Sequence, residues 1–304
     1  MGLPRCDTCR MPSPSFLTLP APAKLNLFLH ITGRRPDGYH ELQTAFQLLD
    51  RGDELSFANR EDGKLLLHCS GPRVIDALPP EHNLVYRAAN KLRAHCPEAR
   101  GRGAHITLDK RLPSGGGLGG GSSDAASTLL ALNTLWGLHR SVDELAELGR
   151  ELGADVPVFV RGHSAWAEGT GERLTPMELP ERWFVIIYPG RPMATRAIFS
   201  HPELTRDTPA ITMAAFFAGP TRNDCESLVR RLLEPVNKAL IWLQNFGEAR
   251  MTGSGACVFA AFPGELTARS VQAQVPAPWE SFVARGVQRS PAWERLGASR
   301  PARQ

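Results

Sequence analysis

The chain has 304 residues, enough for two domains or one large domain. Its net charge of +4 and apolar content of 42% are typical of a globular protein and favour a small anionic ligand over nucleic acid. No apolar run approaches the length of a membrane span and no secretory signal is present, so we expect a cytoplasmic protein without membrane contact. The sequence does not indicate an oligomeric state.

Residues 1–17 contain several prolines and no periodic pattern, which predicts a disordered N-terminal extension. Cys6 and Cys9 have the spacing of two metal ligands, but no second pair completes a zinc site. We therefore expect reduced thiols in a reducing compartment. The metal ligands of the protein, if it has any, stay unknown at this point.

The first predicted strand covers residues 22–31, where apolar and polar side chains alternate. Lys24 and Asn26 share one face of it, although a lysine at a strand start is often only a solvated charge. The turn at 33–38 presents Tyr39 and His40, an aromatic ring beside a ring that can form hydrogen bonds. These two side chains either have a function or simply pack against their neighbours.

Two further strands, 54–57 and 64–69, flank a turn at 60–63 that predicts a hairpin. A helix at 83–94 and a strand at 105–110 follow. The remaining predicted elements are helices at 124–136, 141–152 and 265–273, two consecutive helices within 223–242, and strands at 165–167, 183–188, 256–262 and 282–287.

Two loops stand out in the second half of this pattern. Asp155 precedes the apolar run 156–160, and it is either a turn residue or a carboxylate at the lip of a buried strand. The segment 250–255 is a short glycine loop that leads into a strand.

A proline-bearing link at 175–180 predicts a domain boundary, which divides the chain into 18–178 and 179–304.

The segment 113–124 contains six glycines in the seven positions 115–121, between a predicted strand and a predicted helix. Glycine is costly to order, but it lets the backbone adopt positive φ and approach a ligand closely. Ser122 or Ser123 is expected to cap the helix, whose free N–H groups then face the loop. This arrangement predicts an anion site, most often for phosphate, with a flexible linker as the alternative.

Three well-known glycine motifs do not fit this segment. A P-loop requires a lysine that is absent here, since Gly121 and Ser122 occupy the two possible positions. The dinucleotide fingerprint matches 115–120 but lacks the parallel strand–helix–strand context. The companion motifs of the protein kinases are absent as well.

The segment 113–123 instead resembles the ATP loop of the GHMP kinases. Segments 22–27, 36–40, 152–159 and 252–257 match the same family in the same order. The resemblance implies an α+β, two-domain GHMP kinase fold, with a ribosomal protein S5-like N-terminal ATP-binding domain and a ferredoxin-like C-terminal domain. The active site would lie in the cleft between them.

The resemblance also implies ATP as the phosphoryl donor and Mg²⁺ as its companion. Asp155 would accept or orient the proton of the acceptor hydroxyl, and Lys24 would be its cationic partner. The residues that would bind ATP are Pro113, Ser114, Gly115, Gly116, Gly117, Leu118, Gly119, Gly120, Gly121, Ser122 and Ser123.

Segments 22–27 and 36–40 resemble the family members of the non-mevalonate isoprenoid pathway, whose small-molecule substrate is a cytidine-diphosphate-linked sugar alcohol. Tyr39 would stack on the base, His40 would bond its edge, and Phe199 would cover the second face. The other expected substrate contacts are Asn26, Thr195, Thr252 and Gly253. Alternatives are a family member with another substrate, a related decarboxylase, or a relative that binds nucleotide without catalysis.

Overall fold

The computed structural model describes residues 16–74 and 79–298, and residues 1–15, the major part of the predicted extension, lie outside these ranges. The strands are β1 (Phe16–Arg34), β2 (His40–Arg60), β3 (Leu65–Ser70), β4 (Gly103–Asp109), β5 (Ala165–Glu168), β6 (Arg173–Pro176), β7 (Trp183–Tyr188), β8 (Ala249–Met251), β9 (Val258–Phe262) and β10 (Glu280–Val287). The α-helices are α1 (Leu84–His95), α2 (Gly120–Leu135), α3 (Val142–Arg150), α4 (Val156–Arg161), α5 (Thr195–Phe199), α6 (Met213–Ala218), α7 (Glu226–Leu232), α8 (Glu234–Gln244), α9 (Glu265–Gln272) and α10 (Pro291–Ala298).

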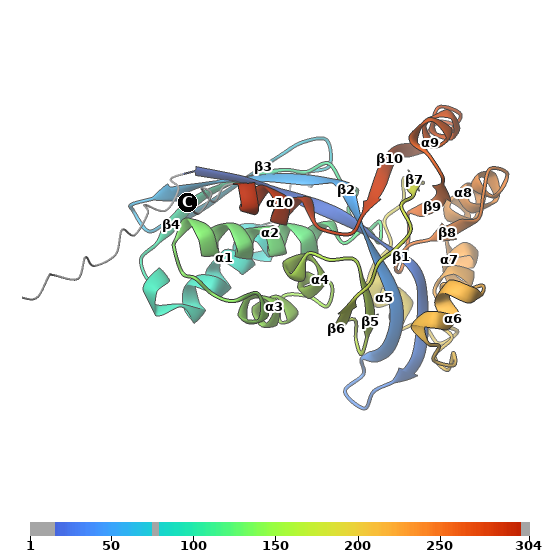
Figure 1. Cartoon of the computed structure of the whole chain (residues 1–304), viewed down its shortest axis with the longest axis horizontal. Helices are drawn as coiled ribbons and strands as arrows, with labels where there is room; N and C mark the ends of the chain where they lie inside the picture. The colour runs from blue at the N-terminus through green and yellow to red at the C-terminus, as the bar shows by residue number, and fades with distance from the viewer. Residues whose placement is uncertain (1–15, 75–78, 299–304) are drawn as a thin grey trace, which may run out of the picture.

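The ten strands of the described ranges belong to one sheet, whose main path is β3-β4-β2-β10-β7-β9-β8. The long strands β1 and β2 pair antiparallel and run through both halves of the molecule (Figure 1). β1 begins earlier than predicted, because Phe16 and Leu17 pair with Ala58 and Phe57 of β2. These two residues therefore belong to the sheet and not to the N-terminal extension.

The predicted hairpin at 60–63 is wrong. β4 lies between β2 and β3, pairing antiparallel with β2 and parallel with β3. The turn at 60–63 reverses the chain as expected, but helix α1 then carries it across to β4 in a strand–helix–strand unit. Turn residues specify a reversal of direction, and they do not specify which strand occupies the neighbouring place.

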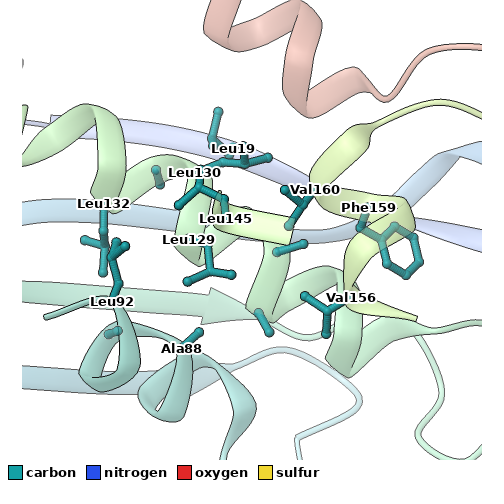
Figure 2. Close-up of a cluster of buried hydrophobic side chains, with 14 of the residues drawn as sticks. Leu19, Ala88, Leu92, Leu129, Leu130, Leu132, Leu145, Val156, Phe159 and Val160 are labelled. Carbon is teal, nitrogen blue, oxygen red and sulfur yellow. The ribbon is translucent and has the colours of Figure 1, made fainter. Parts of the chain in front are cut away.

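Helix α2 forms the centre of the N-terminal half. Every residue from Ser123 to Leu132 is buried, because α1, α3, α4 and the sheet surround the helix. Figure 2 shows Leu129 and Leu130 of α2 in the same cluster as Leu19 of β1 and Val160 of α4. None of the helices in the described ranges combines the length and the apolar character needed to cross a bilayer.

The apolar run 156–160 forms helix α4, not the buried strand that was one of the two alternatives. Pro157 stands in its first turn, where a missing N–H costs nothing, and Gly162 ends it with φ +68°. A short apolar run does not by itself distinguish a buried strand from a buried helix. Asp155 consequently occupies the N-cap position of α4.

The C-terminal half has the ferredoxin-like arrangement that the resemblance implies. Its strands lie in the order β10-β7-β9-β8, with helices α7, α8 and α9 in the connections. β10 also pairs with β2 through Gly286 and Val287, which joins the two halves. The unpredicted helix α10 then returns to the N-terminal half, where Leu296 joins the core.

Truncation of a core residue tests this packing. We expect Leu129→Ala to lower the free energy of unfolding by about 2–5 kcal/mol, because it removes a fully buried side chain from a core that relaxes only partly. Leu266→Ala is the matched control, since Leu266 is 86% exposed, and its effect should stay within about 0.5 kcal/mol. Urea unfolding followed by circular dichroism measures both, and equal losses would contradict the described core.

Candidate active site

A cleft of about 1250 Å³ lies between the two halves. It is lined by the glycine segment, by parts of β1 and β2, and by residues of the C-terminal half such as Thr195, Phe199 and Gly253. Of the residues that the sequence singles out, only Ser123 and Thr252 do not line it. Segments up to about 230 positions apart in the sequence therefore meet at one site.

Three glycines of the loop adopt a conformation that side chains rarely tolerate. Gly115, Gly117 and Gly119 have φ values of +67°, +76° and +71°. A Cβ atom at Gly117 would lie 2.2 Å from the carbonyl oxygen of Thr252, and one at Gly119 would lie 2.9 Å from the ring of Phe159. Both the backbone angles and the contacts require glycine here.

The loop carbonyls are held from the C-terminal half. The backbone N–H groups of Met193 and Ala256 both donate to the Gly115 oxygen, and that of Cys257 donates to the Gly116 oxygen at 3.0 Å. Because these carbonyls point toward the protein, the loop presents N–H groups to the cleft.

Helix α2 begins at Gly120, with Gly119 as a left-handed N-cap that supplies no side-chain hydrogen bond. The predicted caps Ser122 and Ser123 lie inside the first helical turn instead, because the glycines continue into the helix. The first N–H groups of an α-helix have no partner within it and carry its positive dipole end. Since Gly119, Gly120, Gly121 and Ser122 line the cleft, this helix start is available to an anion there.

The two serines differ in their surroundings. Ser122 lines the cleft, whereas the hydroxyl group of Ser123 is buried and has no hydrogen-bond partner. The Ser123 N–H is used within the loop, since it donates to the Gly119 oxygen at 2.9 Å. The structure therefore does not bring Ser123 to the cleft.

Lys24 and Asp155 form an ion pair at the glycine loop. The Lys24 Nζ atom lies 3.2 Å from Oδ2 of Asp155, and it also donates to the Gly117 oxygen at 3.0 Å. The ammonium group is almost fully buried, whereas 31% of the Asp155 side chain is exposed. The carboxylate is thus reachable from the cleft, and the cation behind it is held in place.

Asn26 and Thr252 support Lys24 and the loop. The Asn26 Oδ1 atom accepts from Lys24, its Nδ2 atom donates to Thr44, and its N–H donates to the Thr252 hydroxyl at 3.0 Å. That hydroxyl group donates in turn to the Gly117 oxygen. Both ends of the Asn26 amide are engaged within the protein although Asn26 lines the cleft, and Thr252 is fully buried.

Aromatic side chains occupy another part of the cleft. Tyr39 is 65% exposed at its rim, and the buried His40 ring lies 5.3 Å from the Phe199 ring, tilted by 48°. The Thr195 hydroxyl bonds that of Ser254, a cleft residue that the sequence did not single out.

Comparisons with known proteins agree with this geometry. The family pattern of the GHMP kinases N terminal domain matches residues 83–163, and that of the GHMP kinases C terminal domain matches residues 211–281. A 4-diphosphocytidyl-2-C-methyl-D-erythritol kinase of Alkalilimnicola ehrlichii is 56% identical over 279 residues, which is 91% of this chain and 93% of that protein. The chain belongs to the GHMP kinase family.

Other GHMP kinases extend the comparison. A protein of Chromohalobacter salexigens with the same name is 55% identical and covers 92% of this chain and 94% of its own length. A crystal structure of 4-(cytidine 5'-diphospho)-2C-methyl-D-erythritol kinase has a TM-score of 0.74 and 35% identity, over 89% of this chain and 100% of that one. The mevalonate kinase of Methanococcus jannaschii shares the fold, with a TM-score of 0.67 at 15% identity over 90% of this chain and 98% of that one.

The cleft of this GHMP kinase also contains residues that sequence reasoning missed. An apolar slot is formed by β3, β4 and the start of α1, and its lining residues are Leu67, Cys69, Asn83, Leu84 and Leu108. The Asn83 side chain both caps α1, through the N–H of Val85, and contacts the Cys69 sulfur at 3.7 Å. Its place at the helix start was visible in the sequence, but its place in the cleft was not.

Beside this slot lies a buried charged cluster, Asp53–Lys110–Asp124. The Lys110 Nζ atom bonds Asp53 and lies 2.8 Å from Asp124 Oδ2. Asp53 also accepts from the N–H groups of Arg111 and Leu112, which lead into the glycine loop. The cluster thus ties both ends of the loop to β2. In the sequence, the one indication of this cluster is that Lys110 and Asp124 stand on either side of the glycines.

The cluster has an unusual protonation balance, since two carboxyl groups share one ammonium group. Burial raises the pKa of Asp124 to about 7, with Lys110 opposing the shift and Asp53 adding to it. Burial alone would lower the pKa of Lys110, but Asp124 and Asp53 outweigh it and the net shift is upward. The Asp124 Oδ1 atom is buried without a hydrogen-bond partner, which also disfavours a negative charge on this carboxyl group.

Substitution within the loop gives one prediction. We expect Gly117→Ala to lower phosphoryl transfer by about 100-fold or more, because the methyl group would push the loop away from Thr252 and displace the carbonyl that holds Lys24. Gly101→Ala is the matched control, with φ +78° but open space around the added atom. It should cost about 1 kcal/mol of stability and leave turnover unchanged. Steady-state kinetics decide, and equal activities of the two variants would contradict this role of the loop.

The raised pKa of Asp124 gives a second prediction. Folding favours the protonated form of Asp124. The contribution of this group to the free energy of unfolding is therefore complete below about pH 4 and is lost as pH rises through about 7. In Asp124→Asn this fall disappears, and the variant should gain on the wild type by up to about 1.4 kcal/mol per pH unit between about pH 4 and 7. Urea unfolding at several pH values measures the difference.

Asp62→Asn is the control for this titration, because a hydrogen bond from Arg60 lowers the pKa of the exposed Asp62 to about 2. Its stability difference from the wild type should stay constant above about pH 4. A constant difference for Asp124→Asn as well would show that Asp124 is ionised throughout.

Proposed function

We propose that this GHMP kinase transfers the γ-phosphoryl group of ATP to the 2-hydroxyl group of 4-diphosphocytidyl-2-C-methyl-D-erythritol in the cytoplasm, giving the 2-phosphate and ADP in the non-mevalonate isoprenoid pathway. Relatives with this name at 53–56% identity support the substrate. The observation that carries the proposal is that one cleft holds an anion-binding helix start, the Lys24–Asp155 pair and the aromatic side chains Tyr39 and Phe199.

ATP would bind with its phosphates at the glycine loop. The N–H groups presented by the loop and by the start of α2, together with the helix dipole, suit a polyphosphate. The apolar slot offers flat apolar surface to the adenine base, with Asn83 able to donate and accept hydrogen bonds. We assign the slot to the base because it adjoins the Lys110 end of the loop.

Mg²⁺ is expected to accompany the nucleotide. Within the described residues no cluster of three or more His, Cys, Asp or Glu side chains could hold a metal ion alone. This fits magnesium, which commonly uses one or two protein oxygens together with phosphates and water. Asp155 and Ser122 are two cleft residues that could supply such oxygens. When bound, the ion neutralises charge on the phosphate oxygens.

Asp155 and Lys24 would act on the acceptor hydroxyl group. The partly exposed Asp155 carboxylate can orient this group and accept its proton as the new P–O bond forms. The Lys24 ammonium, 3.2 Å behind it, can stabilise negative charge on the attacking oxygen. Phosphoryl transfer passes through a loose transition state, so positioning by the loop should supply most of the rate.

The cytidine end of the acceptor would lie among Tyr39, His40 and Phe199. The exposed Tyr39 ring can close over one face of the base and Phe199 can cover the other. Gly253 and Thr195 would line the sugar alcohol or diphosphate path. Asn26 and Thr252 would position Lys24 and the loop, and Asn26, which lines the cleft, would also be within reach of the substrate.

The decisive experiment is an ADP-release assay with the cytidyl substrate against mevalonate and homoserine. We expect turnover with the cytidyl compound alone, because neither of the other alcohols carries a base to stack. Asp155→Asn should lose about 10²–10⁴-fold in turnover and still bind ATP by titration calorimetry, since the carboxylate acts in the chemical step.

Asp143→Asn is the matched control, because Asp143 is an exposed carboxylate on α3 that pairs with Arg161 at the surface. It should keep full turnover. If mevalonate or homoserine is phosphorylated and the cytidyl compound is not, the substrate assignment is wrong. Unchanged turnover in Asp155→Asn would remove this residue from the mechanism.

A further inference from the structure

His40 lines the cleft, but a residue outside the cleft lining decides how its ring is protonated. The Nε atom of Arg206 donates a hydrogen bond to the His40 Nε2 atom at 3.0 Å. A guanidinium group has only donors and keeps its charge in proteins, so Nε2 must be the acceptor. A neutral imidazole carries one proton, which therefore resides on Nδ1.

Arg206 is itself fixed in place. Its Nη atoms donate to the backbone oxygens of Phe199 at 3.0 Å, His201 at 2.7 Å and Leu204 at 2.9 Å. One guanidinium group thus fastens the segment after α5 and the His40 ring together. Since the His40 ring packs on the Phe199 ring, the same residue sets the spacing of two walls of the cleft.

The charges around His40 favour the neutral ring. Burial lowers the pKa of His40, and the positive charges of Arg206 and Arg34 lower it further. A doubly protonated ring would also present an N–H group to Arg206 in place of the acceptor. The ring therefore offers the cleft a single, defined donor.

We propose that Arg206 is a positioning residue that fixes His40 as the Nδ1–H tautomer, and that this tautomer selects cytosine over uracil. The inference rests on the proposed function, in which His40 bonds the base edge, and it deepens it by naming the residue that fixes the protonation of His40. The Watson–Crick edge of cytosine has acceptors at N3 and O2, whereas N3 of uracil carries a hydrogen. An N–H donor facing N3 therefore favours cytosine and leaves two donors opposed in uracil.

The tautomer can be measured directly and without substrate. Nitrogen-15 NMR of histidine-labelled protein near pH 8, with His40→Ala used to assign the signal, should show Nδ1 protonated and Nε2 bare. In Arg206→Met the signal should shift toward a mixture of tautomers, which a purely structural role would not cause. An Nε2–H tautomer in the wild type would overturn the inference.

Kinetics test the selection. We expect Arg206→Met to raise KM for the cytidyl substrate about tenfold, to leave KM for ATP within about twofold, and to reduce the preference over the uridyl analogue. Arg231→Met is the control, since Arg231 binds Glu203 of the same segment at the exposed surface, and it should change none of these values.

A double-mutant cycle separates positioning from general damage. In a His40→Ala background, Arg206→Met should add little to the loss of preference for the cytidyl compound, because its partner is already gone. A full additive loss would overturn the inference. Because the NMR result needs no substrate, an inactive wild type with the Nδ1–H tautomer would count against the proposed function and leave the Arg206–His40 arrangement standing.

Discussion

The close approach of two backbones, at Gly117 and Thr252, is the constraint on which the cleft depends. No side chain fits between them, so the glycine loop and the loop after β8 can share their contacts. The Gly117 oxygen accepts from both Lys24 and the Thr252 hydroxyl group. One carbonyl group therefore sets the position of the ammonium group, and through it that of the Asp155 carboxylate, relative to the start of α2.

Sequence patterns predicted correctly those helices and strands that are specified by neighbouring residues. The capping box at Ser141 starts α3 as expected, and the buried strand β7 coincides with its apolar run. Predictions became wrong where the outcome depends on distant partners. β4 lies between β2 and β3, with which it pairs, and residues 156–160 form a helix that packs against α2 and α3. Both outcomes depend on partners that no short window of sequence contains.

The site shows the same division. The glycine loop, Lys24 and Asp155 carry motifs, and the structure brings them together as the resemblance implied. Lys110 and Asp124 have no motif, because their relation arises from a carboxylate on β2 more than fifty positions away. Arg206 has no motif either, because its role depends on a hydrogen bond to one nitrogen atom of His40, 166 positions earlier in the chain. The prediction that Ser122 or Ser123 caps α2 is wrong for a geometric reason, since the helix begins at Gly120 and the Ser123 side chain is buried.

The strand pairing between β2 and β10 makes the two halves parts of one sheet. A large hinge rotation between them would have to break backbone hydrogen bonds of that sheet, and α10 adds a second attachment by packing on the first half. The cleft is therefore preorganised, and little of the free energy of ligand binding is spent on drawing the halves together. Adaptation to a ligand falls instead to its rim, where the exposed Tyr39 follows a tight turn at Gly38 and can move without disturbing the sheet.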